Sequence, residues 1–344
     1  MLLKTILIIG KGSIGEKHRL VAEKHRLVQR VVCVSHRAFI DATKDCSLLD
    51  VNDYLTSIVG TLPDAAVIAG PASDHIDVAQ LLLAADVPMI VEKPLSDSVE
   101  HAQQFSHKLA QCDVPVCVGY NLRYSRSLNC FKEQIDSHLL GAIYSLRSEV
   151  GQYLPDWRPQ TDYRQSVSAT ASLGGGVLLE LSHEIDYLQW IFGRVDRVIG
   201  IVDTVSQLDV DVEDSADVLM SFEGGSVCHA ITASLHMDFC RRDTVRRCTV
   251  TGEQGTLIWD GVANTVSHYT AQHSEWQVIF NDISSKYETY ELAFDSFMQR
   301  IDTNATHAAL ASVEQATSVL AVIEAIRKSS SSRQSEHVEH EGAP

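Results

Sequence analysis

The chain has 344 residues, 45% hydrophobic and 21% charged, so it is long enough for two domains whose cores need neither disulfides nor metals. Its 28 basic and 45 acidic residues give a net charge of −17, which argues against nucleic acid or an anionic membrane as the main partner. No run approaches the roughly 18 apolar residues of a membrane span. We therefore expect no membrane segment, and no stretch at the start fits a signal peptide.

Eight cysteines occur without any Cys-x-x-Cys pair, and several lie in apolar runs, as Cys33 and Cys117 do. A free cysteine in such a run behaves as a small hydrophobic residue. We therefore expect reduced thiols rather than a disulfide framework, and a cytoplasmic location. The spacing of histidines and cysteines supports no metal site, and none is expected.

The first third of the chain alternates apolar runs of strand length with amphipathic segments. Strands are expected at 2–9, 31–34, 64–69, 88–91 and 114–118, and helices at 14–28, 74–85 and 98–110. This alternation is typical of βαβ units with right-handed crossovers. We predict an α/β Rossmann domain with a parallel, doubly wound sheet over residues 1–119.

The pattern changes near Gly119. Strand candidates of period two follow at 143–151 and between 195 and 269, and an antiparallel hairpin is expected from 216–222 and 226–235. Helices are expected at about 123–139, 181–192, 288–302 and 310–328. We predict a second, α+β domain with a large, mostly antiparallel sheet over 120–328. Residues 329–344 have few apolar side chains, and we predict a disordered tail there.

A glycine-rich motif follows the first strand and opens the first helix. Gly10 allows the tight turn, Gly12 lets the backbone approach a pyrophosphate, and Gly15 allows close helix–strand packing. The helix N-terminus favours the anion. We expect a dinucleotide to be bound by Gly10, Gly12, Ser13, Ile14 and Gly15. The alternative is a plain strand-to-helix turn.

The end of the second strand bears on the choice of dinucleotide. A site for NAD usually has a carboxylate there, whereas this chain has Ser35, His36 and Arg37, and no carboxylate before Asp41. A hydroxyl and a guanidinium suit a 2′-phosphate. We therefore predict NADP in preference to NAD. The alternative is that Arg37 is a solvated loop residue.

Two further motifs carry groups that suit proton transfer. Glu92-Lys93-Pro94 follows the apolar run 88–91, and a lysine at the carboxyl end of a parallel strand can hold a substrate oxygen. Glu180, His183 and Asp186 are spaced by three residues, which would put them on one helix face. The alternatives are a surface lysine and a buried structural histidine or metal ligand.

Aromatic and charged side chains alternate in a loop that begins at Tyr153. Trp157, Arg158 and Tyr163 suit an oxygen-rich, anionic sugar, and the alternative is a packed loop anchored by the tryptophan. The basic run 241–247 is expected to be an exposed strand with solvated charges rather than a binding patch.

The ordered set of motifs resembles the glucose–fructose oxidoreductase / inositol dehydrogenase / MocA (Gfo/Idh/MocA) family over residues 3–330. The set comprises Gly10–Gly15, Pro71 with His75, Glu92-Lys93-Pro94, Gly119-Tyr120-Asn121-x-Arg123 and Gly174–Asp186. The resemblance implies NAD(P)-dependent hydride transfer to or from a hydroxyl-bearing carbon of a sugar, amino sugar or polyol. Lys93 and His183 match the family's catalytic lysine and histidine.

The resemblance also assigns the remaining site residues. Pro71, His75, Glu92 and Asn121 match positions that line the cofactor, and we expect Arg123 and Asp186 at the substrate. Many members have Asp four residues before the catalytic histidine, whereas this chain has Leu179 there. Either Glu180 substitutes for that carboxylate, or its role is missing.

Several wider expectations follow from the same family. The open face of the second sheet commonly forms the oligomer interface, which implies a homodimer or homotetramer. The loop at 153–159 resembles members associated with unusual surface sugars such as those of nonulosonic-acid pathways. The alternatives are a catalytically silent dinucleotide sensor and a non-redox, glycosidase-type enzyme that uses tightly bound NAD transiently.

Overall fold

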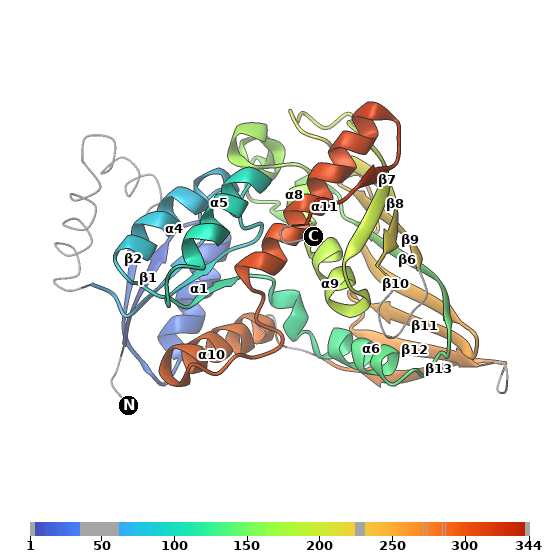
Figure 1. Cartoon of the computed structure of the whole chain (residues 1–344), viewed down its shortest axis with the longest axis horizontal. Helices are drawn as coiled ribbons and strands as arrows, with labels where there is room; N and C mark the ends of the chain where they lie inside the picture. The colour runs from blue at the N-terminus through green and yellow to red at the C-terminus, as the bar shows by residue number, and fades with distance from the viewer. Residues whose placement is uncertain are drawn as a thin grey trace. The chain divides into compact units, whose positions relative to one another are not determined.

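The computed structural model describes residues 4–34, 62–223, 231–270, 272, 274–283, 285 and 287–340. The chain forms two compact units (Figure 1). The first comprises Met1–Asn121 and Lys286–Thr317, and the second comprises Leu122–Ser285 and Ser318–Pro344. Among the described residues, no helix combines the length and the apolar character that crossing a membrane requires.

The first unit contains a five-stranded parallel sheet of order β2-β1-β3-β4-β5. Its strands are β1 (Lys4–Ile9), β2 (Val28–Val34), β3 (Ala65–Ile68), β4 (Met89–Val91) and β5 (Val116–Val118). Helices α1 (Ser13–Lys24), α4 (His75–Ala84) and α5 (Val99–Leu109) flank the sheet (Figure 1). The apolar runs of the central strands are buried, as a parallel sheet covered on both faces requires. The predicted α/β Rossmann sheet is confirmed.

The strand order reverses at β1, which has β2 on one side and β3 on the other. Ligands of such sheets bind beyond the carboxyl ends of the strands at this reversal. The loops after β1 and β3 approach closely here, because a Cβ on Gly10 would lie 2.4 Å from the Ala69 carbonyl oxygen. Gly10 also has a φ of +121°, which favours glycine.

Helix α10 (Glu288–Thr303) belongs to the first unit, which corrects the assignment of all of 120–328 to the second domain. It packs on α1, where the His25 imidazole lies 3.2 Å from Asp295 and meets the Phe294 ring edge-on at 5.3 Å. Asp302 pairs with Lys4 at 2.9 Å. These partners are about 270 residues apart in sequence, so helix periodicity alone cannot show which sheet α10 covers.

The second unit contains a nine-stranded sheet of order β13-β12-β11-β10-β6-β9-β8-β7-β14. Every neighbouring pair is antiparallel except β6 and β9, which confirms the predicted mostly antiparallel sheet. Its strands are β6 (Ile143–Gly151), β7 (Val195–Asp203), β8 (Ser215–Phe222), β9 (Thr232–Asp238), β10 (Val245–Gly252), β11 (Gly255–Asp260), β12 (Thr265–Thr270), β13 (Trp276–Asn281) and β14 (Glu336–His337).

One face of this sheet is covered by helices. These are α6 (Arg126–Asp136), α8 (Val177–Glu180), α9 (His183–Phe192) and part of α11 (Val313–Ser332) (Figure 1). Tyr187 of α9 meets Trp259 of β11 edge-on at 5.2 Å, and its hydroxyl lies 2.6 Å from that of Ser148. Both rings are fully buried and form the centre of this core. The other face is open.

The predicted hairpin is confirmed, because β8 and β9 pair antiparallel with Ser221 opposite Thr232. Residues 224–230, which include part of the predicted turn, lie outside the described residues. Along β8, buried positions such as Val218 alternate with exposed ones such as Leu219. This alternation of period two is what a sheet with one open face requires.

The tail predicted to be disordered from residue 329 is ordered through residue 340, which corrects that prediction. Helix α11 continues to Ser332, and β14 pairs with β7, Glu336 lying opposite Val198. The reason is that serine hydroxyls satisfy backbone groups of β7: the Gly200 N–H donates to Ser329, and the Val202 N–H donates to Ser330, both at 3.0 Å. A serine run that is poor in apolar residues is therefore held by hydrogen bonds to a sheet.

Ser329→Ala should lower the free energy of unfolding by about 1–3 kcal/mol, because the buried Gly200 N–H loses its acceptor. The matched control is Ser331→Ala, since the exposed Ser331 hydroxyl bonds only a carbonyl of its own helix. That variant should change stability by less than about 0.5 kcal/mol. Denaturant titration of both variants measures this, and equal stabilities would contradict an ordered C-terminal segment.

Candidate functional site

The glycine loop between β1 and α1 is closed on one side and open on the other. A Cβ on Gly15 would lie 1.9 Å from the Gly10 carbonyl oxygen, so helix and loop are in direct contact there. Gly12 is exposed, caps the N-terminus of α1, and would meet no atom within 4 Å if it carried a Cβ. Ser13 and Ile14 begin the helix, whose first N–H groups point toward this open side. The loop therefore fits a pyrophosphate.

Pro71 and His75 support the neighbouring loops. Pro71 is buried before the 3-10 turn η1 (Ala72–Asp74), and His75 is only 1% exposed. Its ring nitrogens lie 2.8 Å from the Pro94 carbonyl and 3.0 Å from the Gly70 carbonyl. Burial lowers the pKa of His75, so the neutral ring donates to one carbonyl at a time. His75 thus joins the loops that follow β3 and β4, and its predicted place along the cofactor stays a prediction.

Glu92, at the end of β4, is buried among partners. Its Oε1 lies 2.6 Å from His18 Nε2, and its Oε2 accepts the Lys93 backbone N–H at 3.2 Å. Burial opposes ionisation, but the hydrogen bond from His18 and the charges nearby outweigh it and lower the pKa of Glu92. A buried carboxylate therefore lies at the sheet edge beside the half-buried Lys93.

Several predicted cofactor residues thus occur in the first unit, at the carboxyl edge of its sheet. Asn121 completes this group, and its side-chain amide donates to the Thr289 hydroxyl of α10 at 2.9 Å. Ser35, His36 and Arg37 lie outside the described residues. No motif assigned a role to His18 or to α10. The only signal for His18 was its place on the helix that follows the glycine loop.

In the second unit, the predicted helix over 181–192 starts two residues late and is preceded by a separate short helix. Helix α8 ends at Glu180 and α9 begins at His183, so these two residues do not share one continuous helix face. Glu180 accepts a hydrogen bond from the Ser168 hydroxyl at 2.8 Å. His183 is half-buried in the first turn of α9. The arrangement presents the imidazole at a helix start, with the carboxylate held from a neighbouring segment.

Arg123 and Asp186 are buried against each other, and their predicted contact with the substrate stays a prediction. Their exposed fractions are 2% and 1%, and two hydrogen bonds of 2.9 and 2.6 Å join guanidinium and carboxylate. Arg123 comes from the 3-10 turn η2 (Asn121–Tyr124), and Asp186 lies one turn after His183. The pair therefore anchors the first turn of α9 and holds His183, the first residue of that helix, in place.

The aromatic loop is partly a packed anchor. The Trp157 indole at the end of α7 (Leu154–Trp157) donates to the Gln152 carbonyl at 3.1 Å and meets Phe239 edge-on at 5.2 Å. The Tyr163 hydroxyl accepts the Asp209 N–H at 3.1 Å. Arg158 is exposed. These contacts favour a structural role for both aromatic rings and leave Arg158 as an accessible, positively charged side chain of the loop.

The basic run 241–247 is exposed in part, as predicted, since Arg242 and Arg247 are exposed and β10 begins at Val245, but its arginines also have partners. Arg242 stacks over the Tyr153 ring at 3.4 Å, and Arg246 pairs at 2.7 Å with Glu184, which is fully buried. Arg241 pairs with Asp243 inside the run and Arg247 with Asp260 of β11, but Arg241 also reaches Glu149 of β6, and Arg246 reaches Glu184 of α9, 62 residues away. Spacing within the run could not reveal these distant partners.

A parallel sheet with an open glycine loop at its reversal and a lysine at its carboxyl edge defines a dinucleotide-binding enzyme unit. Residues 4–120 match the family model described as oxidoreductase family, NAD-binding Rossmann fold, and residues 130–258 match that of the GFO/IDH/MocA C-terminal domain. The chain therefore belongs to the Gfo/Idh/MocA family, and it is an NAD-binding oxidoreductase.

Known relatives agree with this assignment. The rhizopine catabolism protein MocA of Rhizobium meliloti is 24% identical over 243 residues, which cover 64% of this chain and 73% of that protein. Myo-inositol 2-dehydrogenase of Thermotoga maritima is 24% identical over 251 residues, covering 70% and 68%. A levoglucosan dehydrogenase structure with NADH and L-sorbose has a TM-score of 0.80 at 17% identity, covering 99% and 100%, and shows the shared fold.

Removing one partner of the Arg123–Asp186 pair should cost about 3–5 kcal/mol of stability, because the other charge stays buried without compensation. The variants are Arg123→Met and Asp186→Leu. The double variant should be markedly more stable than the sum of the two losses predicts. Urea titration of all four proteins measures the coupling. Additive losses would contradict a direct, buried ion pair.

Proposed function

We propose that the chain is an NAD(P)-dependent dehydrogenase or reductase acting on a hydroxyl-bearing carbon of a sugar, amino sugar or related polyol. The observation that carries this proposal is the open backbone at Gly12, which lies on the same sheet edge as the buried Glu92 and the half-buried Lys93. The family supports the reaction type, and the relative named myo-inositol 2-dehydrogenase supports a polyhydroxylated substrate.

In this proposal each polar side chain has one task. When bound, the nicotinamide accepts or donates the hydride. The Lys93 ammonium holds the substrate hydroxyl or carbonyl oxygen. His183 takes the hydroxyl proton during oxidation and returns it during reduction. We assign Glu180 to the position of the family's aspartate, where its carboxylate, held by Ser168, orients the sugar.

We further propose that Arg158 contacts an anionic group of the substrate. Its guanidinium is exposed, and the adjacent Trp157 ring packs on Phe239. This packing holds the loop that carries Arg158 in place. A guanidinium pairs well with a carboxylate. An acidic sugar of the kind used in surface-sugar biosynthesis fits this arrangement.

Lys93→Ala and His183→Ala should each lower kcat by roughly 100-fold or more, since one positioned acid–base group contributes about 10²–10⁴ in rate. Arg158→Ala should instead raise the KM for an acidic sugar with a smaller change in kcat. Nicotinamide absorbance with a panel of sugars and polyols measures turnover. NADH fluorescence should show that all three variants still bind cofactor. Wild-type turnover in both Lys93→Ala and His183→Ala would overturn the assignment.

Two other functions are distinguishable by the same assay. A non-redox, glycosidase-type enzyme would turn over substrate without a net change in nicotinamide absorbance. A catalytically silent dinucleotide sensor would bind NADH but turn over nothing. The presence of both Lys93 and His183 favours the oxidoreductase over the sensor.

We propose NADP as the preferred cofactor, on the basis of Ser35, His36 and Arg37 in the sequence. The expected result is a KM for NADPH at least about tenfold lower than for NADH, since a charge-assisted hydrogen bond contributes about 1.5–3 kcal/mol. Arg37→Ala should remove most of that difference. Equal or better use of NADH by the wild-type chain would contradict the proposal.

A cytoplasmic location is proposed from the cysteines. Six of them, all those within the described residues, are free thiols, and Cys117 and Cys248 are buried. Burial raises the pKa of Cys117 to about 11, which keeps this thiol protonated and unreactive. Such thiols suit a reducing compartment.

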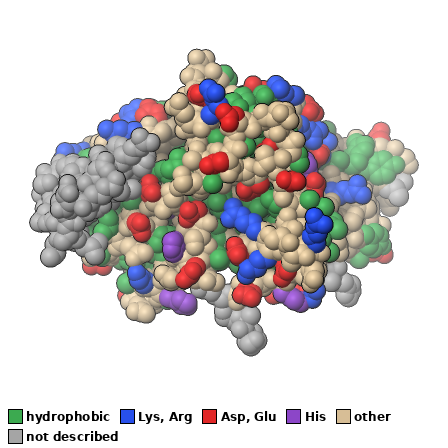
Figure 2. Space-filling model, turned by 90° about the horizontal axis from the view of Figure 1, so that it is seen from above, with side chains coloured by type: hydrophobic (Ala, Val, Ile, Leu, Met, Phe, Trp, Pro, Cys, Tyr) green, Lys and Arg blue, Asp and Glu red, His purple; other side chains and the backbone are tan. Residues whose placement is uncertain are grey.

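We also propose that copies of the chain associate through the open face of the nine-stranded sheet. Large apolar side chains are exposed there, among them Ile199, Ile201 and Leu219 at 49%, 70% and 49%. They line a hollow of about 520 Å³. Figure 2 shows hydrophobic side chains gathered at its right-hand end, where Figure 1 draws this sheet. An exposed apolar patch of this kind is typical of an association surface.

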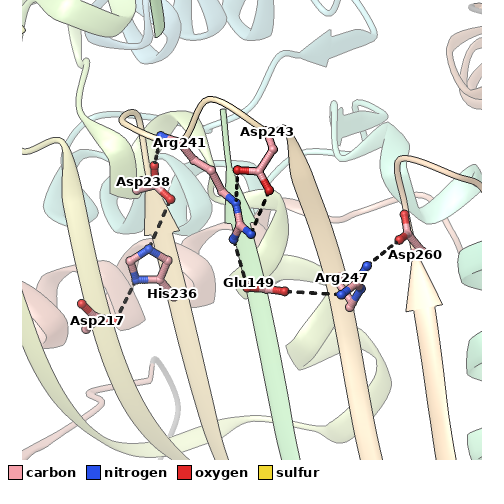
Figure 3. Close-up of polar contacts among 8 residues, drawn as sticks. All are labelled: Glu149, Asp217, His236, Asp238, Arg241, Asp243, Arg247 and Asp260. Carbon is pink, nitrogen blue, oxygen red and sulfur yellow. Dashed lines mark hydrogen bonds and ion pairs between the residues drawn. The ribbon is translucent and has the colours of Figure 1, made fainter. Parts of the chain in front are cut away.

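Several of the charges on this face are paired with one another (Figure 3). The His236 ring lies between Asp238 at 3.2 Å and Asp217 at 2.7 Å, and the hydrogen bonds that it donates to the carboxylates of Asp238 and Asp217 raise its pKa to about 9. Arg241 and Arg247 pair with Glu149 and with carboxylates of neighbouring turns and strands. Paired charges cost less to bury than isolated ones, so a second copy can cover the face.

Ile201→Glu should dissociate the wild-type assembly into monomers at micromolar concentration, because a carboxylate would be buried without a partner. Val262→Glu is the matched control, since Val262 is 53% exposed in the β11–β12 turn and does not line the hollow. Light scattering after size-exclusion chromatography gives the masses. A monomeric wild-type chain, or an unchanged assembly in Ile201→Glu, would contradict the proposal.

A further inference from the structure

We propose that His18 is a positioning residue for Lys93: its imidazole holds the Glu92 carboxylate so that the second carboxylate oxygen accepts the Lys93 backbone N–H. This inference rests on the proposed function, in which Lys93 holds the substrate oxygen. All three residues lie in the first unit. No sequence motif assigned a task to His18.

The first step is the contact between His18 and Glu92. His18 projects from α1, and its Nε2 lies 2.6 Å from Glu92 Oε1. The two side chains are only 5% and 9% exposed, so solvent cannot replace this hydrogen bond. A buried carboxylate without a donor takes up a proton. His18 is therefore the side chain that keeps Glu92 ionised.

The second step is the enclosure of this pair. A Cβ on Gly119 would lie 2.9 Å from the Glu92 carboxylate, so the end of β5 closes one side. The Tyr290 ring of α10 meets the His18 ring edge-on at 5.3 Å. Burial, followed by the charge of Glu92, raises the pKa of Tyr290, which stays neutral. Lys17 lies over the outer part of that ring, 5.1 Å from its centre. The pair has little room to rearrange.

The third step is the hydrogen bond between the Lys93 backbone and Glu92. Glu92 Oε2 accepts the Lys93 N–H at 3.2 Å, and a carboxylate accepts this bond more strongly than a protonated carboxyl does. The orientation and the charge of Glu92 both depend on His18 and both act on the backbone of Lys93. Because α1 begins at the glycine loop, one helix carries the proposed pyrophosphate site and the residue that positions the lysine.

The test begins with a measurement that needs no substrate. Carboxyl ¹³C NMR of the full chain, labelled in glutamate and assigned with Glu92→Gln, follows the titration of Glu92. His18→Leu and His18→Asn, whose amide is too short to reach, should shift the Glu92 titration upward by at least about one pH unit. His18→Gln keeps a donor and should restore most of the wild-type titration. An unchanged Glu92 titration in both His18→Leu and His18→Asn would overturn the inference.

The matched control comes from the same helix. His25 contacts Asp295 of α10 at 3.2 Å but does not touch Glu92, so His25→Gln perturbs the same helix pair without reaching the site. It should leave the Glu92 titration and turnover unchanged. If His25→Gln shifts the Glu92 titration as much as His18→Asn does, the effect is general loosening of α1, and the inference fails.

Turnover and pH complete the test. With a turned-over polyol, His18→Leu should lower kcat by about tenfold to a hundredfold while NADH affinity by fluorescence stays within about twofold. The acid limb of the kcat–pH profile should lie at higher pH in His18→Leu than in the wild-type chain. The lowered pKa of Glu92 stabilises the fold above the usual carboxyl pKa of about 4.3, and this contribution is lost as pH falls below that value through the lower pKa of the folded chain. The stability loss in His18→Leu should therefore shrink as pH falls below about 4.3.

The proposed function and the positioning role of His18 can be disproved independently of each other. Wild-type turnover in Lys93→Ala would overturn the proposed function whatever Glu92 does. An inactive Lys93→Ala together with normal Glu92 titration in the His18 variants would overturn the positioning role and leave the proposed function standing. If His18→Leu does not fold, His18→Asn and His18→Gln still decide between the two outcomes.

Discussion

Burial opposes the ionisation of a carboxyl group, and much of the first unit is arranged around one that is ionised despite burial. Glu92 lies at the carboxyl end of β4, where a parallel sheet presents its ligand-binding edge. A histidine from α1 supplies the donor, and a glycine at the end of β5 leaves the space. The covering helix α10 comes from far along the chain.

In the second unit the buried charge is compensated by an opposite charge in a complete ion pair. Arg123 and Asp186 neutralise each other inside the core and fix the start of α9, so that His183 occupies the first helical position. In both units a buried charged side chain supports a half-buried, proton-carrying one. The supporting residues are buried, whereas Lys93 and His183, the groups proposed to react, are half-buried.

Local patterns predicted the strands, the glycine loop and the hairpin, because each depends on near neighbours in sequence. Contacts between distant segments were not predictable in that way. The periodicity of α10 shows an apolar face but not the helix it packs on, and the serines from Ser329 resemble a disordered tail until a strand edge is beside them. Arg123 and Asp186 carry charges that suit a substrate site, and only their mutual distance reveals that each satisfies the other. The place of His18 on the helix after the glycine loop does not show its task, which only its contact with Glu92 reveals.

We infer that the carboxyl edge of the first sheet holds a nicotinamide cofactor with Lys93 at the reacting end. A crystal structure of the chain with NADPH or NADH bound would show the position of both ends of the cofactor. We expect the pyrophosphate on the backbone of Gly12 and Ser13, at the N-terminus of α1, and the nicotinamide ring beside the Lys93 amino group. A pyrophosphate elsewhere, or a nicotinamide ring remote from Lys93, would contradict it.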